Sequence, residues 1–135
     1  MTGGCQCRVV RYQVWDAPET VYVCHCTECR RQSASAFGIS VIVRSAAFRL
    51  TQGRAISWFR RTASGAKLTC WFCPKCGTRL WHVDDVHPDI RSVKGGTLDT
   101  PPDLSRAAHI HTDSKLAGVL IPDDVPTFRG EPPGG

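Results

Sequence analysis

The sequence predicts a mainly β protein, a single zinc-stapled domain with little helix. Short stretches in which apolar and polar residues alternate recur between turn residues, and this pattern is typical of strands. No segment keeps a helical period over three turns. Closely spaced cysteines at three places predict metal sites that tie such strands together. We expect one domain over residues 1–128, because 135 residues is the length of one domain, and a disordered tail over 129–135.

The expected strands follow one another along the chain. The first covers 8–15, and the second, 20–23, leads directly into a group of three cysteines. The stretch 37–43 is the most apolar one and predicts a central, buried strand. Helix is expected only as one or two turns at 30–36. Further strand-like runs, separated by turn signals, are 47–51, 56–61, 67–72, 79–83, 90–94 and 109–112.

The location of the protein bears on how its eight cysteines are interpreted. The N-terminus has no basic region followed by an apolar run, so we expect no signal peptide. No run of about 18 apolar residues predicts a membrane span. We therefore expect a cytoplasmic protein without a membrane partner. In a reducing compartment paired cysteines indicate metal ligands or catalytic thiols before disulfides. A secreted, disulfide-linked protein is the alternative.

Four cysteines form two short-spaced pairs that lie far apart in the sequence. Cys5 and Cys7 stand near the start, and Cys73 and Cys76 stand past the middle. Structural zinc takes four ligands in a closed tetrahedron. We therefore expect one zinc to join the two pairs and to add directly to the free energy of folding. A redox disulfide and plain buried thiols are the alternatives. Gly77 follows the second pair, where a metal knuckle commonly needs a positive φ.

Three further cysteines, Cys24, Cys26 and Cys29, lie within one short segment. Three ligands leave a tetrahedral zinc one position for water or substrate, so we expect an open zinc site here and assign these residues as catalytic. Three thiolates give such a zinc a net charge of −1, which makes it a poor Lewis acid but still able to hold an incoming thiol as thiolate. The charge favours sulfur chemistry over hydrolysis. The alternative is a second structural zinc, closed by Cys70 or by a histidine.

Cys70 is the eighth cysteine and lies outside both sets. The sequence leaves open whether it is a ligand of the second site or a free thiol. If it is free, we expect it to be the one readily alkylated cysteine of the zinc-loaded protein.

Several basic residues accompany the three cysteines. Arg30 and Arg31 directly follow Cys29, and they either bind substrate carboxylates through forked hydrogen bonds or form a solvated face. His25 lies between two ligands, so we expect its side chain to point away from the metal. The remaining candidates for an acid–base group, by residue type alone, are His82, His109 and His111.

The formal charge of +5 suggests a nucleic-acid partner. Seven thiolates remove seven charges and two zinc ions restore four, so the zinc-loaded protein carries about +2. Nucleic acid is therefore not the expected partner. A non-enzymatic zinc module that contacts protein or nucleic acid remains the alternative to an enzyme, and its surface would be Arg60-Arg61 beside Trp58-Phe59. A thiol redox enzyme that uses Cys70 is a third hypothesis. Oligomeric state is not predicted.

The three cysteine motifs, in this order, resemble those of the glutathione-dependent formaldehyde-activating enzyme family. The motifs are Gly4-Cys5-Gln6-Cys7, Cys24-His25-Cys26-Thr27-Glu28-Cys29-Arg30 and Phe72-Cys73-Pro74-Lys75-Cys76-Gly77-Thr78. Gly96-Thr97-Leu98-Asp99, His109-Ile110 and Ser114-Lys115 also look like its later pattern.

The resemblance implies a Mss4-like zinc fold. It implies a structural zinc on the first and last cysteine pairs and an active-site zinc on the central three. It also implies carbon–sulfur lyase activity that joins glutathione to formaldehyde, giving S-hydroxymethylglutathione. Glutathione is then a co-substrate, and Arg30 or Arg31 is expected to pair with one of its carboxylates.

Overall fold

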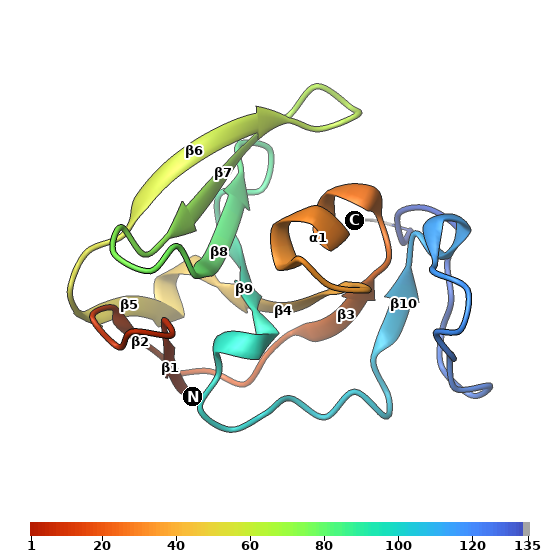
Figure 1. Ribbon diagram of the computed structural model, residues 1–135, viewed down its shortest axis with the longest axis horizontal. Coiled ribbons are helices and arrows are strands. Elements are labelled where there is room, and N and C mark those ends of the chain that lie inside the picture. Colours follow the sequence, from red (N-terminus) through yellow and green to blue (C-terminus); the bar gives the residue numbers. More distant parts are fainter. Residues whose placement is uncertain (134–135) are drawn as a thin grey trace.

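The computed structural model describes residues 1–133, which form two β-sheets and one α-helix (Figure 1). The smaller sheet consists of β1 (Thr2–Gly4), β2 (Arg11–Val14) and β5 (Phe48–Gln52). The larger sheet, in spatial order, consists of β10 (Ala108–Ile110), β3 (Thr20–Cys24), β4 (Gly38–Arg44), β9 (Ile90–Lys94), β8 (Arg79–Asp84), β7 (Lys67–Phe72) and β6 (Ile56–Arg61). The mainly β prediction with little helix is confirmed.

All neighbouring strands pair antiparallel except β10, which runs parallel to β3. The helix α1 (Thr27–Ser33) lies over β4 on one side of the larger sheet (Figure 1). Single 3-10 turns follow three of the strands: η1 (Ser45–Ala47), η2 (Gly95–Thr97) and η3 (Thr112–Ser114).

The first strands depart from the sequence prediction. The strand expected at 8–15 begins only at Arg11, because Arg8 has a φ of 67° and bends the chain after the first cysteine pair. β1 was not expected, since two of its three residues are glycine, which has low strand propensity. Gly3 is required by packing: a Cβ there would lie 2.3 Å from the Tyr12 hydroxyl oxygen.

The helix and the last strand also differ in their bounds. Helix was expected at 30–36, but α1 begins at Thr27, inside the three-cysteine segment, because Cys26 caps its first turn. It ends before Ala34, whose φ of 51° is left-handed. The strand expected at 109–112 ends at Ile110, since His111 has a φ of 54°.

The hydrophobic core lies between the smaller sheet and one face of the larger sheet. Tyr12 stacks on Phe48 at a ring-centroid distance of 5.2 Å, and Phe48 packs on Trp81 at 4.8 Å. The buried members of this core are Cys5, Val10, Tyr12, Val14, Val41, Val43, Ala47, Phe48, Cys73, Leu80, Trp81 and Val93. This core joins the two sheets, whereas Cys24, Cys29 and Ile110 form a small cluster of their own.

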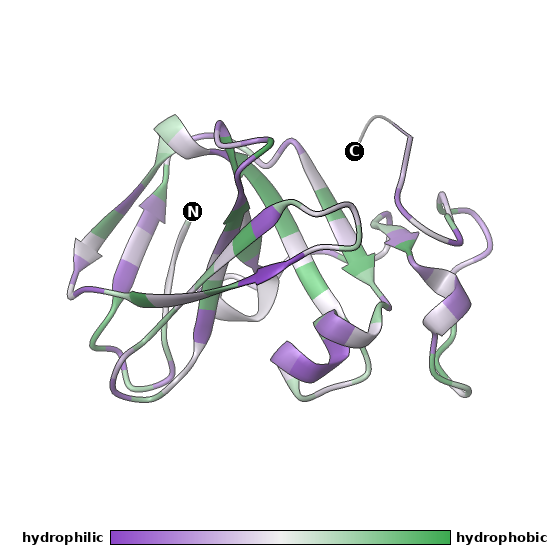
Figure 2. Ribbon diagram, turned by 90° about the horizontal axis from the view of Figure 1, so that it is seen from above, coloured by the Kyte–Doolittle hydropathy of each residue, from purple (hydrophilic) through white to green (hydrophobic). Residues whose placement is uncertain are grey.

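The two faces of the larger sheet differ in character, because the strands alternate apolar and polar residues (Figure 2). The register places Val41, Val93 and Trp81 side by side on the apolar face. It places Cys24, Ser40, Lys94, Ser92 and His82 along the opposite face, which we call the polar face. The helix α1 partly covers the polar face.

The segment after β10 folds back beside it. The His109 N–H donates to the Pro126 carbonyl and the Phe128 N–H donates to the His109 carbonyl, both at 2.9 Å, while the His111 N–H donates to the Gly130 carbonyl at 3.0 Å. Arg129 pairs with Asp113 at 2.8 Å, so these contacts extend into the expected tail of 129–135. Residues 134–135 of that tail lie outside the described residues. Within residues 1–133, none of the helices has the length and apolar character needed to cross a membrane.

Replacing Val41 by Ala should lower the free energy of unfolding by about 1.5–3 kcal/mol, because the side chain is fully buried in the core. Val86→Ala, at a residue that is 64% exposed, is the matched control and should change it by less than about 0.5 kcal/mol. Urea unfolding of the metal-loaded variants measures both. Equal effects at the two positions would contradict the assigned core.

Candidate metal centres

The first and last cysteine pairs form a four-sulfur group. Cys5, Cys7, Cys73 and Cys76 bring their sulfur atoms within 4.8 Å of one another. Neighbouring sulfurs are 3.6 Å apart between Cys5 and Cys7 and 3.7 Å apart between Cys7 and Cys73. A disulfide would need about 2.05 Å, whereas a zinc ion with four sulfurs at about 2.3 Å sets them about 3.8 Å apart. The four-sulfur group therefore fits a closed tetrahedral zinc site.

Backbone amides support the sulfurs of this group. The amides of Lys75 and Cys76 donate to the Cys73 sulfur at 3.3 and 3.4 Å, and that of Val10 donates to the Cys5 sulfur at 3.3 Å. The Thr78 hydroxyl lies 3.1 Å from the Cys76 sulfur and lowers the pKa of that thiol to about 5. These donors favour the thiolate form that a metal requires. Gly77 has the expected positive φ, 79°.

The central cysteines form a second, three-sulfur group: Cys24, Cys26 and Cys29, also within 4.8 Å of one another. Cys24 is the last residue of β3, and the other two belong to the start of α1. The Cys29 amide donates to the Cys26 sulfur at 3.2 Å, so the helix cap and the site share one contact. Gly38 pairs with Cys24, and a Cβ on it would lie 3.1 Å from the Cys29 Cβ, tighter than most such contacts. Glycine at this position lets the helix approach the sheet.

The thiols of the three-sulfur group do not ionise independently. The pKa of Cys26 is lowered because the thiols of Cys24 and Cys29 hydrogen-bond to its sulfur, and for the same reason the pKa of Cys24 is raised. One thiolate therefore forms easily and further ones repel it. A dication placed among the sulfurs removes this repulsion, so the donor set fits a metal ion such as zinc.

Cys70 belongs to neither group. Among residues 1–133, no fourth Cys, His, Asp or Glu ligand atom joins the three-sulfur group, so neither Cys70 nor a histidine closes it in this structure. Cys70 is only 1% exposed, and its thiol points to the Leu68 carbonyl at 3.8 Å. The expectation of a readily alkylated thiol is wrong, because the Cys70 side chain is buried beyond the reach of a reagent in solution.

His25 and His109 form a buried pair beside the three-sulfur group. Their ring nitrogens Nε2 and Nδ1 lie 2.8 Å apart, and burial lowers the pKa of both imidazoles. The His25 amide also donates to the Ile110 carbonyl at 3.0 Å. His25 therefore holds the cysteine segment against β10. No ring nitrogen of His25 or His109 belongs to the three-sulfur group.

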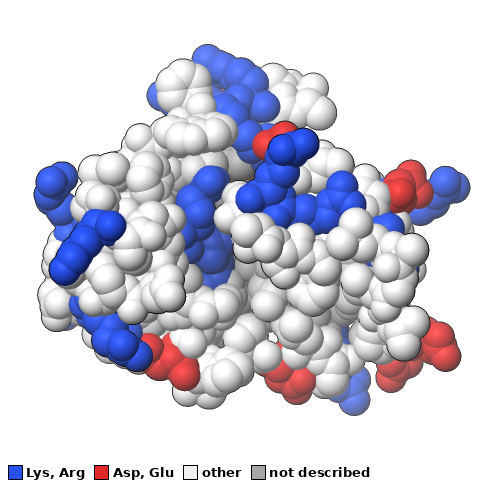
Figure 3. Space-filling view, in the orientation of Figure 1, with Lys and Arg blue, Asp and Glu red and all other residues white. Residues whose placement is uncertain are grey.

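Two adjoining cavities open on the polar face beside the three-sulfur group. The smaller, about 270 Å³, lies between α1 and strands β6–β9, and Cys29 lines it. The larger, about 400 Å³, extends to β3 and β10, and all three cysteines line it. Cys29, Arg60, Leu68 and His82 border both cavities. Figure 3 shows a recess with Lys or Arg atoms on its wall, between the side that carries β6–β8 and the side that carries α1.

The smaller cavity is rich in basic residues: Arg31, Arg60, Arg79, His82 and Lys94 line it, with Glu28 as the acidic residue among the lining. Glu28 pairs with Arg60 at 3.5 Å, which leaves the other cations without this counter-charge. The pKa of His82 lies well below its usual range, because burial disfavours the imidazolium and Lys94 repels it. The cavity is therefore suited to an anion.

The two arginines that follow Cys29 are placed differently. Arg31 lines the smaller cavity. The Arg30 guanidinium instead donates to the Ser114 carbonyl at 3.1 Å and holds η3 against the helix. His111 lines the larger cavity with Cys26, and its Nε2 lies 2.8 Å from a carboxylate oxygen of Glu131, another lining residue.

Sequence reasoning missed two residues of this site, Lys94 and Arg79. A detectable signal existed for Lys94: in the run 90–94, Ser92 and Lys94 recur at the strand period on either side of the apolar Val93, which assigns them to one face. The cysteine-bearing strand could not be assigned to that same face without the pairing of β3, β4 and β9. Arg79 had no signal beyond its charge.

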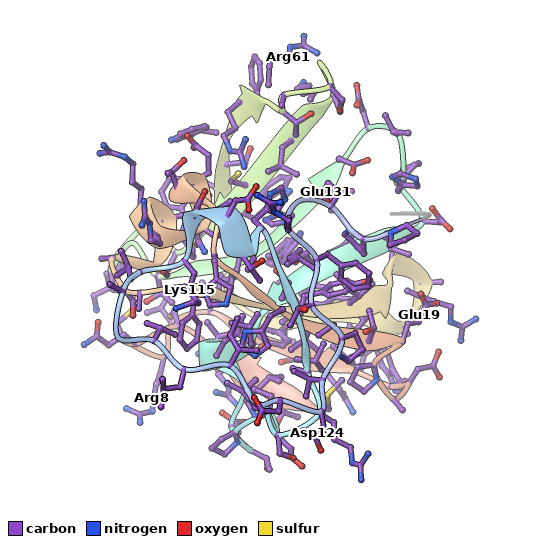
Figure 4. All side chains as sticks on the ribbon, turned by 90° about the vertical axis from the view of Figure 1, so that its right-hand side faces the viewer. Arg8, Glu19, Arg61, Lys115, Asp124 and Glu131 are labelled. Atoms are coloured by element: carbon purple, nitrogen blue, oxygen red, sulfur yellow. The ribbon has the colours of Figure 1, made fainter. Side chains whose placement is uncertain are left out.

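The surface proposed for a non-enzymatic module is divided. Trp58 and Phe59 are 50% and 54% exposed, but neighbours in a strand point to opposite faces. Arg60 accordingly lines the cavities, while Arg61 and Lys67 lie over the Phe59 ring at 5.8 and 4.6 Å on the other face. Figure 4 shows Arg61 at the outer end of β6. The residues do not make one continuous aromatic and basic surface.

The family model described as "Glutathione-dependent formaldehyde-activating enzyme" matches residues 1–114, which include both cysteine groups. The chain belongs to this family. Its structure is also similar to the crystal structure of a Rhodobacter sphaeroides protein from a structural genomics programme, with a TM-score of 0.61 and 25% sequence identity. The similarity covers 81% of this chain and 99% of that one. The match also bears out the resemblance predicted from the cysteine motifs.

Replacing Cys73 by Ser should unfold the protein or make it insoluble, because the four-sulfur group joins the two sheets. Cys26→Ser should instead leave a folded protein with one zinc fewer, since the three-sulfur group belongs to a small cluster separate from the main core. Circular dichroism and metal analysis of the purified variants measure the two effects. Equal loss of fold in both would show that the three-sulfur group is structural.

Cys70→Ser should keep both metals, because its thiol belongs to neither sulfur group. In the native zinc-loaded protein Cys70 should react with iodoacetamide at least about tenfold more slowly than in the unfolded protein, since burial excludes the reagent. Mass spectrometry of timed samples measures the rate. Loss of a zinc from Cys70→Ser would instead identify Cys70 as a ligand.

Proposed function

We propose that the protein is a zinc-dependent enzyme that forms or cleaves the carbon–sulfur bond of a thiol–aldehyde adduct, in the class of S-hydroxymethylglutathione. The observation that carries this proposal is the contrast between a closed four-sulfur group and a three-sulfur group that borders two cavities. Membership of the family supports glutathione and formaldehyde as the first substrates to test.

The residues divide the work between the two metal sites. Cys5, Cys7, Cys73 and Cys76 would hold a structural zinc ion between the sheets. Cys24, Cys26 and Cys29 would hold a second zinc ion and leave one position facing the cavities. When bound there, the second zinc supplies a site at which a thiol is held as thiolate at neutral pH.

The overall reaction replaces one bond by another and moves one proton. The thiolate sulfur attacks the aldehyde carbon, so a carbon–sulfur bond forms while the carbonyl π bond breaks. The proton that leaves the thiol finally resides on the former carbonyl oxygen. No oxidant or reductant is consumed. The protein must therefore bind the thiol, exclude competing water and provide a group that carries this proton.

His111 is the residue best placed to carry the proton. It borders the larger cavity beside Cys26, and Glu131 holds its Nε2 by a hydrogen bond of 2.8 Å, which fixes the orientation of the ring. His82 borders both cavities, but its lowered pKa makes it a weak base that does not readily take up a proton. His109 is bound to His25 and lines neither cavity. Of the three histidines predicted from sequence, we therefore propose that His111 carries the proton from the thiol to the carbonyl oxygen.

Arg31 is the arginine that we retain for a substrate carboxylate. It borders the smaller cavity, whereas the Arg30 guanidinium is engaged with the Ser114 carbonyl. Cysteine-bound metal chemistry of this kind suits a reducing compartment, so we also propose a cytoplasmic location. A non-enzymatic zinc module is the alternative, and the exposed Trp58 and Phe59 are the observation that favours it.

Glutathione should bind the two-zinc protein with release of a proton, because its sulfur binds as thiolate. The affinity should fall by about tenfold for each unit of pH below the thiol pKa, since protons compete for the same sulfur. Titration calorimetry in two buffers of different ionisation enthalpy measures the released proton directly.

Cys26→Ser should abolish this binding, and Cys70→Ser, which keeps both groups intact, is the matched control. Turnover is followed by NMR with labelled formaldehyde, in which the hydroxymethyl carbon of the adduct has its own resonance. If no thiol, free or as an aldehyde adduct, binds the two-zinc protein, the enzyme proposal is wrong. The hypothesis of a non-enzymatic zinc module then replaces it.

A further inference from the structure

A buried lysine borders the smaller cavity without an assigned role. Lys94, the last residue of β9, is 7% exposed, and its Nζ has no hydrogen-bond partner among the described residues. Burial of an unpaired ammonium is strongly unfavourable, which is why buried lysines are normally paired. The pKa of Lys94 is accordingly lowered by burial. Such a residue is retained at a cost in stability, and this calls for a functional explanation.

The sheet register places Lys94 close to the three-sulfur group. Lys94 pairs with Ser40 on β4, and two residues away on the same strand Gly38 pairs with Cys24. Because residues two apart share a face, Lys94 and Cys24 lie on the same polar face, two strands apart. Lys94 and Cys29 both line the cavity of about 270 Å³.

The other residues of this cavity reinforce the positive charge. Arg79 also lines it and lies over the Trp58 ring at 5.8 Å, which orients the guanidinium but leaves its charge. Arg31 completes the basic set from the helix side. The acidic lining residue Glu28 is paired with Arg60. An anion that entered the cavity would therefore meet Lys94, Arg79 and Arg31 together.

We propose that Lys94 determines specificity at the thiol site by binding a carboxylate of the ligand whose sulfur occupies the open position of the three-sulfur group. The preferred ligand class is a thiol that carries a carboxylate a few bonds from its sulfur. This inference rests on the proposed function, because it needs a thiol at the three-sulfur group. Beyond the proposed function, the inference names Lys94 as the residue that selects among thiols, and a negative charge as the feature that it selects.

A different role for Lys94 makes a distinguishable prediction. The thiolates of Cys29 and Cys24 favour the charged form of Lys94, so the ammonium could instead balance the charge of the metal–thiolate group. Loss of a charge-balancing cation would weaken the binding of every thiol equally. Loss of a carboxylate-binding cation would weaken only thiols that carry a carboxylate.

The test uses zinc-loaded protein and two thiols with the same two-carbon spacer, 3-mercaptopropionate and 2-mercaptoethanol, in titration calorimetry. The wild-type protein should bind the carboxylate at least about tenfold more tightly, as expected for one charged hydrogen bond. In Lys94→Met the ratio of the two affinities should fall to about one, and the affinity for 2-mercaptoethanol should stay within about twofold of its wild-type value. Lys67→Met, at an exposed lysine, is the matched control and should change neither.

A second readout follows from the unpaired charge. Lys94→Met keeps the length of the side chain without the ammonium, so its thermal midpoint should equal or exceed that of wild type. Lys94→Gln provides a second neutral variant should the methionine disturb the packing. A higher midpoint together with a lost carboxylate preference supports the assignment.

Four results would overturn the inference. An unchanged preference in both Lys94 variants would show that the carboxylate binds elsewhere. Equal weakening of both thiols would assign Lys94 to charge balance, with the proposed function intact. Failure of both thiols to bind a wild-type protein that binds glutathione would overturn this inference and leave the proposed function intact. Failure of glutathione and its aldehyde adduct as well would overturn both.

Discussion

The four-sulfur group is the constraint on which the arrangement of the two sheets depends. Cys5 and Cys7 precede the first long strand of the smaller sheet, while Cys73 and Cys76 form the turn between β7 and β8 of the larger one. Cys5 and Cys73 are at the same time buried members of the core between the sheets. A metal bound there would fix both the distance between the sheets and their orientation, so the strands need not be long to define the fold.

The polar face of the larger sheet can carry chemistry because the stability of the fold is supplied on its other side. Val41, Val93 and Trp81 on the apolar face bury their side chains in the core. The opposite face therefore tolerates a lysine, a serine and a histidine side by side, with cavities in place of packing. The three-sulfur group stands at the edge of this face, where α1 begins, and its small apolar cluster is separate from the main core.

Local patterns predicted most of the fold. Local alternation and apolar runs located nine of the ten strands that the structure describes, and cysteine spacing separated the two sulfur groups. Both signals lie within a few neighbouring residues of the sequence. The boundaries failed where a single backbone angle decides them, as at Arg8 and His111, since residue type only weakly predicts positive φ outside glycine. Lys94 and Arg79 were missed for another reason. Their position beside Cys29 depends on the pairing of β4 with β9, which joins residues as far apart in sequence as Ser40 and Lys94, and that pairing is a property of the whole sheet.

The charges around the three-sulfur group explain why the proposed site would favour an anionic ligand although the thiolates that would hold its metal are themselves negative. Three thiolates around a zinc dication leave a single net negative charge, held close to the sulfurs. Lys94, Arg79 and Arg31 border the cavity beside this group, and among these lining residues the one carboxylate, Glu28, pairs with Arg60. The positive charges of these three side chains therefore outnumber the single negative charge that the metal group would carry. The remaining positive charge attracts an anion that enters the cavity. A thiol held at such a metal would carry one negative charge after losing its proton, and a carboxylate on the same molecule would bring a second to the cations. The site is thus complementary to a ligand with two separated negative charges, one of which exists only when the sulfur is bound.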